Sequence, residues 1–195
     1  MQKSQSSSKL LKLVVLSLLA TMSLVLFFIS FPLPLLPPYL KVDFSDIPAL
    51  IAGMIFSPAA GVLVVFLKNL MYFVAKGATD PVGVVANFIA GTLYVFPVAY
   101  LYRKYSGINS IVIGLTIGTV VMAVVMTILN YFIILPAYGM FVGVGFTDTA
   151  KWIAVIGGVL PFNFIKGVIV SILFVPLFFK LKEWIEKKKV PTSAA

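Results

Sequence analysis

One lysine and four asparagines lie in or beside long apolar runs, where polar side chains are candidates for binding a ligand. Lys166 lies in an otherwise uncharged run, and Asn163 precedes it by three residues, so both side chains share one helix face. Asn69, Asn87 and Asn130 lie at similar depth in three other predicted helices. Ammonium and amide groups bind ligands through hydrogen bonds, so this pattern favours a polar cavity that opens outward.

Simpler explanations apply to each of these residues taken singly. A lysine can extend its ammonium to the membrane interface, and a lone asparagine commonly makes a hydrogen bond between helices. For Lys166 the interface is distant, because thirteen residues separate it from Lys180. No acidic residue lies in any apolar run. The partner of Lys166 is therefore a backbone carbonyl, a loop aspartate folded inward, or a bound ligand.

The composition excludes most catalytic and metal sites. The chain has no cysteine and no histidine, which removes thiolate nucleophiles, the usual transition-metal ligands and the Ser-His-Asp triad. Only six residues are acidic, and no Walker A sequence is present. A Ser-Lys base would need Ser171 beside Lys166, but five positions separate them, which does not place both on one helix face. We expect neither an enzyme nor a metal site.

The composition is that of a protein surrounded by lipid. Of the 195 residues 61% are hydrophobic and 11% charged, with a mean hydropathy of +1.11, whereas soluble domains are about 25% charged. Long apolar runs predict membrane-spanning helices and an all-α membrane protein. The first run is too long for a signal peptide and is expected to be retained. The runs cover residues 13–31, 47–67, 81–102, 105–147 (ending near residue 135, before Pro136) and 152–179.

The distribution of charge predicts six spans. Residues 47–75 would form a helix of about 43 Å, too long for a hydrocarbon core of about 30 Å, and the sequence from Ser57 to Gly61 predicts a break. Lysines precede the first span and follow the last, so both termini are predicted to be cytoplasmic, which requires an even number of spans. The net charge of +9 then reflects membrane topology, and nucleic acid is not an expected partner. We expect one domain over 1–195, with disorder at 1–8 and 190–195.

The first external loop is unusually apolar and contains four prolines between residues 31 and 46. Such a loop either covers a pocket as a lid or rests on lipid headgroups. Ser45 or Asp46 is placed to cap a short helix that has Pro48 in its first turn. Asp46 is therefore expected to be structural, and Asp43 is the better candidate to face a pocket.

Small residues predict close helix contacts at Gly114 and Gly118, and at Ala86 and Ala90. In the first span, Ser17 and Thr21 stand four residues apart with Ala20 beside them. This face serves either internal packing or docking of another membrane protein, and both interpretations remain open.

The chain resembles the substrate-binding S components of energy-coupling factor (ECF) vitamin importers, most closely the riboflavin-specific branch. The resemblance covers nearly the whole chain. It rests on the segments LKVDFSDIPAL (40–50), KNLMY (68–72), ANFIAG (86–91), LNYF (129–132) and PFNFIKG (161–167).

The resemblance implies a multi-pass protein of the cell membrane that binds one riboflavin, as transported ligand and not as cofactor, in an outward-facing pocket. Asn130, Asn163 and Lys166 look like the contacts to flavin polar groups, and the loop from Leu40 through Lys41 to Asp43 looks like part of the cover. The ribityl hydroxyls would need partners such as Asn69 or Asn87.

The resemblance also implies partner subunits. Transport would need a transmembrane coupling subunit and a pair of ATPases. The family's first helix carries an Ala-x-x-x-Ala docking motif, and the nearest match here is Ser17 and Thr21. Alternatives are an S component for another vitamin, an FMN-binding one in which Lys41 or Lys76 reaches the phosphate, and a self-sufficient membrane carrier.

Overall fold

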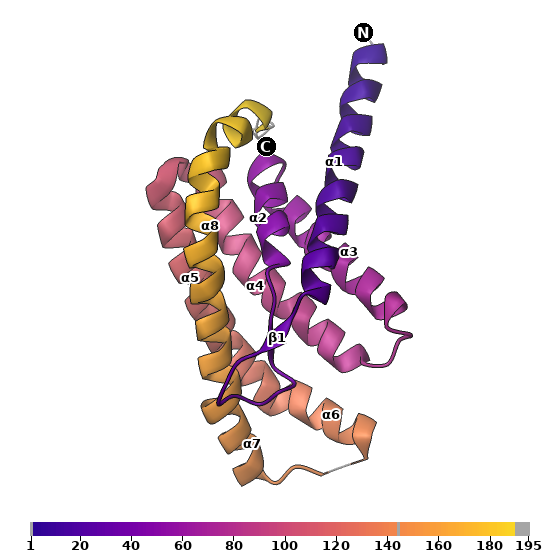
Figure 1. Cartoon of the computed structure of the whole chain (residues 1–195), viewed down its shortest axis with the longest axis vertical. Coiled ribbons are helices and arrows are strands. Elements are labelled where there is room, and N and C mark those ends of the chain that lie inside the picture. The colour runs from indigo at the N-terminus through magenta and orange to yellow at the C-terminus, as the bar shows by residue number, and fades with distance from the viewer. Residues whose placement is uncertain (1, 144, 190–195) are drawn as a thin grey trace.

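The structure is a computed structural model, and it describes residues 2–143 and 145–189. Its elements in chain order are α1 (Gln2–Phe28), β1 (Phe31–Pro32), β2 (Lys41–Val42), α2 (Asp46–Ile55), α3 (Pro58–Ala75), α4 (Pro81–Tyr105), α5 (Gly107–Leu129), the π-helical segment η1 (Asn130–Ile134), α6 (Leu135–Val142), α7 (Asp148–Ala154), the π-helical segment η2 (Val155–Val159) and α8 (Leu160–Lys188). Figure 1 shows a bundle of long helices with the short strand β1 near its centre. The all-α class is confirmed.

Within residues 2–143 and 145–189, five helices are long and apolar enough to cross a membrane: Lys9–Phe28, Pro58–Ala75, Pro81–Tyr105, Gly107–Val142 and Asp148–Lys188. The sixth apolar helix, α2, has ten residues. Its length is therefore about 15 Å, half of a hydrocarbon core of about 30 Å. The chain is an all-α membrane protein with one short helix among its long ones.

The predicted break between residues 47 and 75 is confirmed. The Ser57 backbone is extended, its hydroxyl accepts a hydrogen bond from the Ala60 amide at 3.1 Å, and Pro58 is the first residue of α3. A serine N-cap followed by proline is the usual start of a helix, because the cap accepts a free amide and proline has none to satisfy.

Two predicted boundaries differ from the structure. α1 begins at Gln2, ahead of the run predicted to start at residue 13, and the predicted disorder at 1–8 stays a prediction. Residue 1 and residues 190–195 lie outside the described part. The helix predicted to end near residue 135 continues through Pro136 to Val142. The π-helical segment η1 directly before Pro136 allows this, because its wider turn accommodates a proline that cannot donate a helical hydrogen bond.

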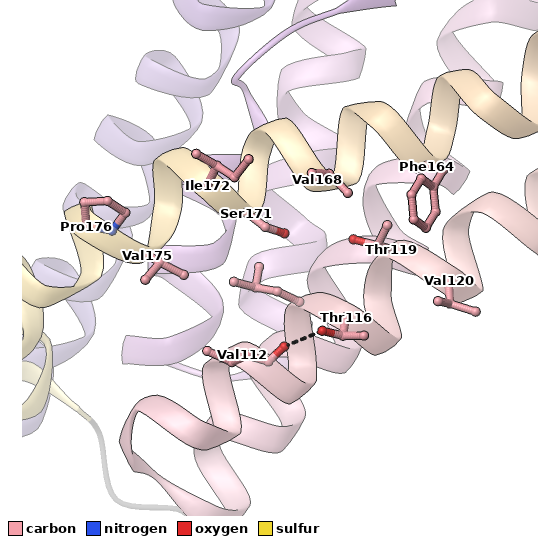
Figure 2. A pocket seen from close by; sticks show the side chains of 11 residues that line it. Val112, Thr116, Thr119, Val120, Phe164, Val168, Ser171, Ile172, Val175 and Pro176 are labelled. Carbon is pink, nitrogen blue, oxygen red and sulfur yellow. Dashed lines mark hydrogen bonds between the residues drawn. The ribbon is translucent and has the colours of Figure 1, made fainter.

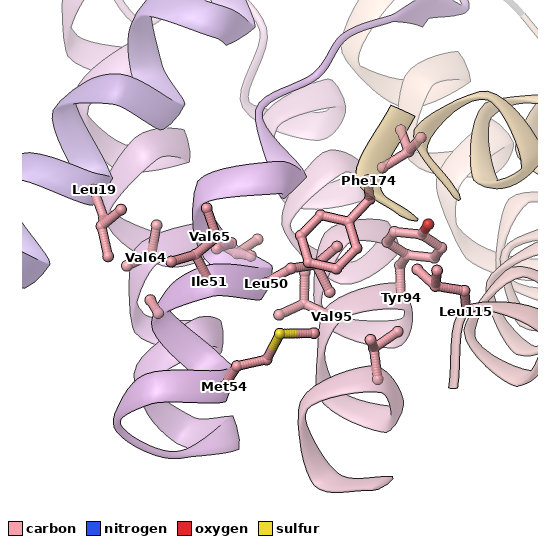
Figure 3. Packing of buried hydrophobic residues seen from close by; sticks show 14 of the residues in the cluster. Leu19, Leu50, Ile51, Met54, Val64, Val65, Tyr94, Val95, Leu115 and Phe174 are labelled. Atoms are coloured by element: carbon pink, nitrogen blue, oxygen red, sulfur yellow. The ribbon is translucent and has the colours of Figure 1, made fainter. Parts of the chain in front are cut away.

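The predicted contact at Gly114 and Gly118 is confirmed. A Cβ added at Gly114 would lie 2.9 Å from the Cα of Val98, and one at Gly118 would lie 2.8 Å from the carbonyl oxygen of Tyr94. Both glycines therefore let α5 approach the α4 backbone directly. Tyr94 lies in the buried apolar cluster drawn in Figure 3.

Gly118→Ala is expected to destabilise the protein by about 1–3 kcal/mol, because the added methyl meets backbone that cannot rotate away. Gly157→Ala is the matched control, since a Cβ there has nothing within 4 Å. Thermal denaturation of both variants in detergent measures the difference. Equal melting temperatures for the two variants would contradict the close contact between α4 and α5.

Basic side chains gather at one end of the bundle. Figure 1 places the N- and C-terminal ends on the same side, opposite α6 and α7. At this end the Lys12 ammonium lies 5.8 Å from the centre of the Phe56 ring, and Arg103 donates to the carbonyl oxygens at the end of α2, at 3.1 and 3.3 Å. Lys189 donates to the Ser106 hydroxyl at 2.8 Å. The clustering agrees with the charge argument for an even number of spans.

Candidate ligand-binding site

The loop between α1 and α2 folds back over the bundle. Its strands pair antiparallel, with Phe31 opposite Val42 and Pro32 opposite Lys41. Within β2 the Lys41 side chain is exposed and Val42 is buried, as expected for neighbours on opposite faces of a strand. A Cβ added at Gly158 would lie 3.2 Å from Pro37 and 3.8 Å from Leu40. The loop therefore covers η2, and of the predicted cover residues Leu40 faces the helices while Lys41 faces away.

The end of this loop and the start of α2 carry two carboxylates, Asp43 and Asp46, into a buried ionic cluster. Asp43 Oδ2 lies 2.9 Å from the Nζ of Lys166 on α8, and Asp46 Oδ1 lies 2.7 Å from the Nζ of Lys68 on α3. The second oxygen of Asp46 lies 3.7 Å from Lys166 Nζ. All four residues are buried. Two cations and two anions balance, so no net charge is buried.

Two serines join the ion pairs and tie in α1. Ser45 donates its backbone amide to Asp43 Oδ1 at 2.9 Å and its hydroxyl to the same oxygen, while Lys68 donates to the Ser45 hydroxyl. Ser23 on α1 donates to the Ser45 carbonyl oxygen. Ser45 does occupy the N-cap position of α2, but its hydroxyl makes no capping bond, which corrects the capping role considered for it. The cluster thus connects α1, the loop, α3 and α8.

Electrostatics keep Asp43 ionised. Burial alone would raise the pKa of Asp43, but the charges of Lys166 and Lys68 and hydrogen bonds from Ser45 and Lys166 outweigh it and hold the pKa well below its usual range. Because the pKa is lower in the folded state, the stability from this carboxylate is complete above the unfolded pKa of about 3.9. It is lost only as pH falls through the lower folded value. The Asp43 carboxylate therefore stays ionised throughout the physiological range.

Of the three partners considered for Lys166, the structure selects the inward-folded loop aspartate, Asp43. Sequence reasoning did not identify Lys68 as a second buried cation. The available signal was its position, the eleventh residue of an eighteen-residue apolar helix. Asp46 has the structural role expected for it. It fills that role through an ion pair with Lys68 and not by capping a helix.

Three of the four asparagines share one hydrogen-bonding pattern. The side-chain amides of Asn69, Asn130 and Asn163 each donate to the carbonyl oxygen four residues earlier, at 2.8, 2.7 and 2.9 Å. All three residues are buried. The bond to the helix backbone holds the amide group in place and leaves the side-chain oxygen directed away from it as an acceptor.

Asn69 and Asn87 lie at the same level of the seam between α3 and α4. The close contacts of Gly61 with Val95 and of Gly91 with Val65 mark this seam, and one further step of four residues along each helix leads to Asn69 and Asn87. The side-chain oxygens of both asparagines are buried, and neither accepts a hydrogen bond from any residue that the structure describes. Unpaired buried acceptors are costly, so this pair is suited to a ligand that donates hydrogen bonds.

Asn130 and Asn163 are both associated with π-helical segments. Asn130 is the first residue of η1, and η2 ends four residues before Asn163. Pro136 and Pro161 follow the two segments, so each wide turn precedes a residue that lacks an amide proton. Single π-turns inside helices occur frequently at functional sites.

The small residues of α1 face in two directions. Ser17 and Thr21 are exposed, and the Thr21 hydroxyl donates to the Ser17 carbonyl oxygen at 2.9 Å. Ala20 is buried in the apolar cluster. The structure corrects the grouping of these residues, because Ala20 serves internal packing and only Ser17 and Thr21 lie on an accessible face.

Two cavities are described, and none of the predicted binding residues lines either of them. One has a volume of about 450 Å³ and lies between α5 and α8. The other, of about 320 Å³, lies where α6 approaches α7 and includes Lys151. The predicted ligand pocket therefore stays a prediction, supported by the ionic cluster and the asparagines.

Long apolar helices around buried polar groups, with a loop folded over one end, define a membrane-embedded binding or transport subunit. A sequence model of the ECF transporter substrate-specific component matches residues 11–178. The chain belongs to this family, whose members are components of transporters and not enzymes.

Named relatives agree with the family. The riboflavin transporter FmnP of Bacillus subtilis is 46% identical over 184 residues, covering 93% of this chain and 97% of that protein. The riboflavin transporter RibU of Staphylococcus aureus is 41% identical over 177 residues, covering 90% and 93%. A structure described as the S component of a bacterial ECF transporter matches with a TM-score of 0.79 at 41% identity, covering 91% of this chain and 99% of the other.

Proposed function

We propose that this chain is the riboflavin-binding S component of an ATP-driven importer in the cell membrane. The observation that carries the proposal is the buried Lys166, held in place by a loop carboxylate and accompanied on its helix face by Asn163. The names of the relatives at 41–46% identity point to the same ligand.

The flavin ring matches the groups around Lys166. Isoalloxazine is flat and apolar on its faces and has carbonyl oxygens and ring nitrogens along its polar edge. In the proposal, Lys166 and the amides of Asn163 and Asn130 contact that edge, and Leu40 of the loop covers a face. Asp43 orients the Lys166 ammonium.

The ribityl chain matches the pair Asn69 and Asn87. Its hydroxyls donate hydrogen bonds, and the two asparagines present buried oxygens that lack a donor. FMN is the second candidate ligand. Lys41 is exposed on the loop and Lys76 lies at the end of α3, where either would meet the phosphate.

The proposal includes a topology and partners. Six passes with both termini in the cytoplasm follow from the basic residues gathered at one end of the bundle. The sequence has no Walker A motif, so a coupling subunit and a pair of ATPases supply the energy. Ser17 and Thr21 on the accessible face of α1 are the proposed docking residues.

Flavin absorbance tests the proposal directly. The chain purified in detergent without added ligand is expected to show a flavin spectrum near one per chain, or to quench the fluorescence of added riboflavin at that stoichiometry. Titration with FMN then compares the two ligands. A colourless protein that leaves riboflavin fluorescence unchanged would contradict the proposed ligand while leaving the family assignment intact.

A further inference from the structure

The larger cavity is a groove on the outer face of the bundle. Its volume is about 450 Å³, within the range of small-molecule sites. Figure 2 shows its two walls, with Val112 to Val120 along α5 and Phe164 to Pro176 along α8. Ile172 is 65% exposed and Phe164 51%, so the groove opens away from the bundle. Its surroundings are therefore the lipid tails and not the proposed flavin site.

Close packing at one point shapes the groove. A Cβ added at Gly167 would lie 2.6 Å from the hydroxyl oxygen of Thr119, so α5 and α8 are in direct contact there. Larger side chains on both sides of this contact line the groove. Its α8 wall spans twelve residue steps, or about 18 Å, which is comparable to one leaflet of a hydrocarbon core about 30 Å thick. The length suits one extended acyl chain.

Two of the three hydroxyls that line the groove, those of Thr116 and Ser171, are already paired with backbone carbonyls. Thr116 donates to the Val112 carbonyl oxygen at 3.0 Å, and Ser171 donates to the Gly167 carbonyl oxygen at 2.7 Å. Figure 2 shows the first of these bonds. A polar ligand would find few free partners here, whereas an acyl chain needs none.

Positive charge lies beyond one end of the groove. Pro176 is the last α8 residue of the lining, and Lys180 follows it by four residues, one helical turn along the same face. Lys180 is exposed, whereas Lys182, two residues further, lies about 200° around the helix from it. The last ten residues of the described chain contain five lysines and two glutamates, so this end is net positive. A phosphate placed one turn beyond the groove would meet Lys180.

We propose that the groove binds one acyl chain of an anionic phospholipid, with its phosphate at Lys180. The apolar, outward-open groove selects a lipid tail, and the lysine selects an anionic headgroup. The site shares no residue with the proposed flavin site and does not depend on it.

Native mass spectrometry with phosphatidylglycerol and phosphatidylcholine of equal chain length tests this proposal. The full chain is expected to retain one phosphatidylglycerol under activation that removes the other lipids. Lys180→Gln should reduce that preference by about five-fold. Lys187→Gln with Lys188→Gln, on the same helix but further from the groove, should change it much less.

A second pair of variants tests the groove itself. Thr116→Trp fills the groove and should abolish retention, whereas Ile165→Trp, an exposed α8 position outside the lining, should not. Riboflavin quenching or an unchanged melting profile shows that a variant is folded. If Thr116→Trp does not fold, Val120→Trp repeats the test. Equal retention of the two lipids, or full retention by the groove-filling variants, would overturn the proposal. A dimer without bound lipid would assign the groove to a second copy of the chain.

Discussion

Lys166→Met is expected to lose most of the flavin affinity and several kcal/mol of stability together. The side chain is 3% exposed and its ammonium lies 2.9 Å from Asp43. Removing it leaves a fully buried carboxylate without its main counter-charge, which costs about 3–5 kcal/mol. A charged hydrogen bond to the flavin contributes about 1.5–3 kcal/mol, so the affinity should fall about ten- to hundred-fold. Thermal denaturation and fluorescence quenching measure the two effects.

A second substitution separates the two effects. Adding Asp43→Asn to the Lys166→Met variant removes the unpaired charge and should restore much of the stability, because a neutral amide is far less costly to bury. It should not restore binding, since the ammonium is still missing. Unchanged affinity in Lys166→Met would refute its assigned contact with the ligand, and recovery of binding in the double variant would show that its role was structural only.

Lys68→Met is expected to give the largest loss of stability without removing a proposed ligand contact. The Lys68 ammonium is fully buried, pairs with Asp46 at 2.7 Å and donates to Ser45. Its loss leaves buried Asp46 with only the longer 3.7 Å ion pair to Lys166 and should cost about 3–5 kcal/mol. The matched control is Lys76→Met, because Lys76 is exposed at the end of the same helix and should change stability little.

A double-mutant cycle measures how strongly Lys68 and Asp46 are coupled. Asp46→Asn in the Lys68→Met variant removes both charges and is expected to be more stable than Lys68→Met alone. The Lys68–Asp46 pair holds the start of α2 against α3, and the loop leads directly into α2. Flavin affinity should therefore fall only to the extent that loss of the pair displaces the loop. Equal melting temperatures for Lys68→Met and Lys76→Met would show that the cluster does not stabilise the fold.

Much of the helical organisation was predictable because it depends on local sequence. Apolar runs determine which segments cross lipid, and the Ser57-Pro58 pair marks a helix start by its own hydrogen bonding. The continuation of the helix past Pro136 was not predictable in this way. It depends on the π-turn at Asn130, whose wider hydrogen-bonding pattern has no distinct residue periodicity.

The importance of Lys166 followed from sequence alone, because a charge in lipid is costly wherever it occurs and must have a partner. Composition likewise excluded histidine and cysteine chemistry. The identity of the partner depended on tertiary structure, since Asp43 and Lys166 are 123 residues apart and meet only when the loop folds over α8. The same holds for Lys68 and for the inward-facing Ala20. Sequence determines what each segment must bury, whereas helix packing determines which buried group meets which.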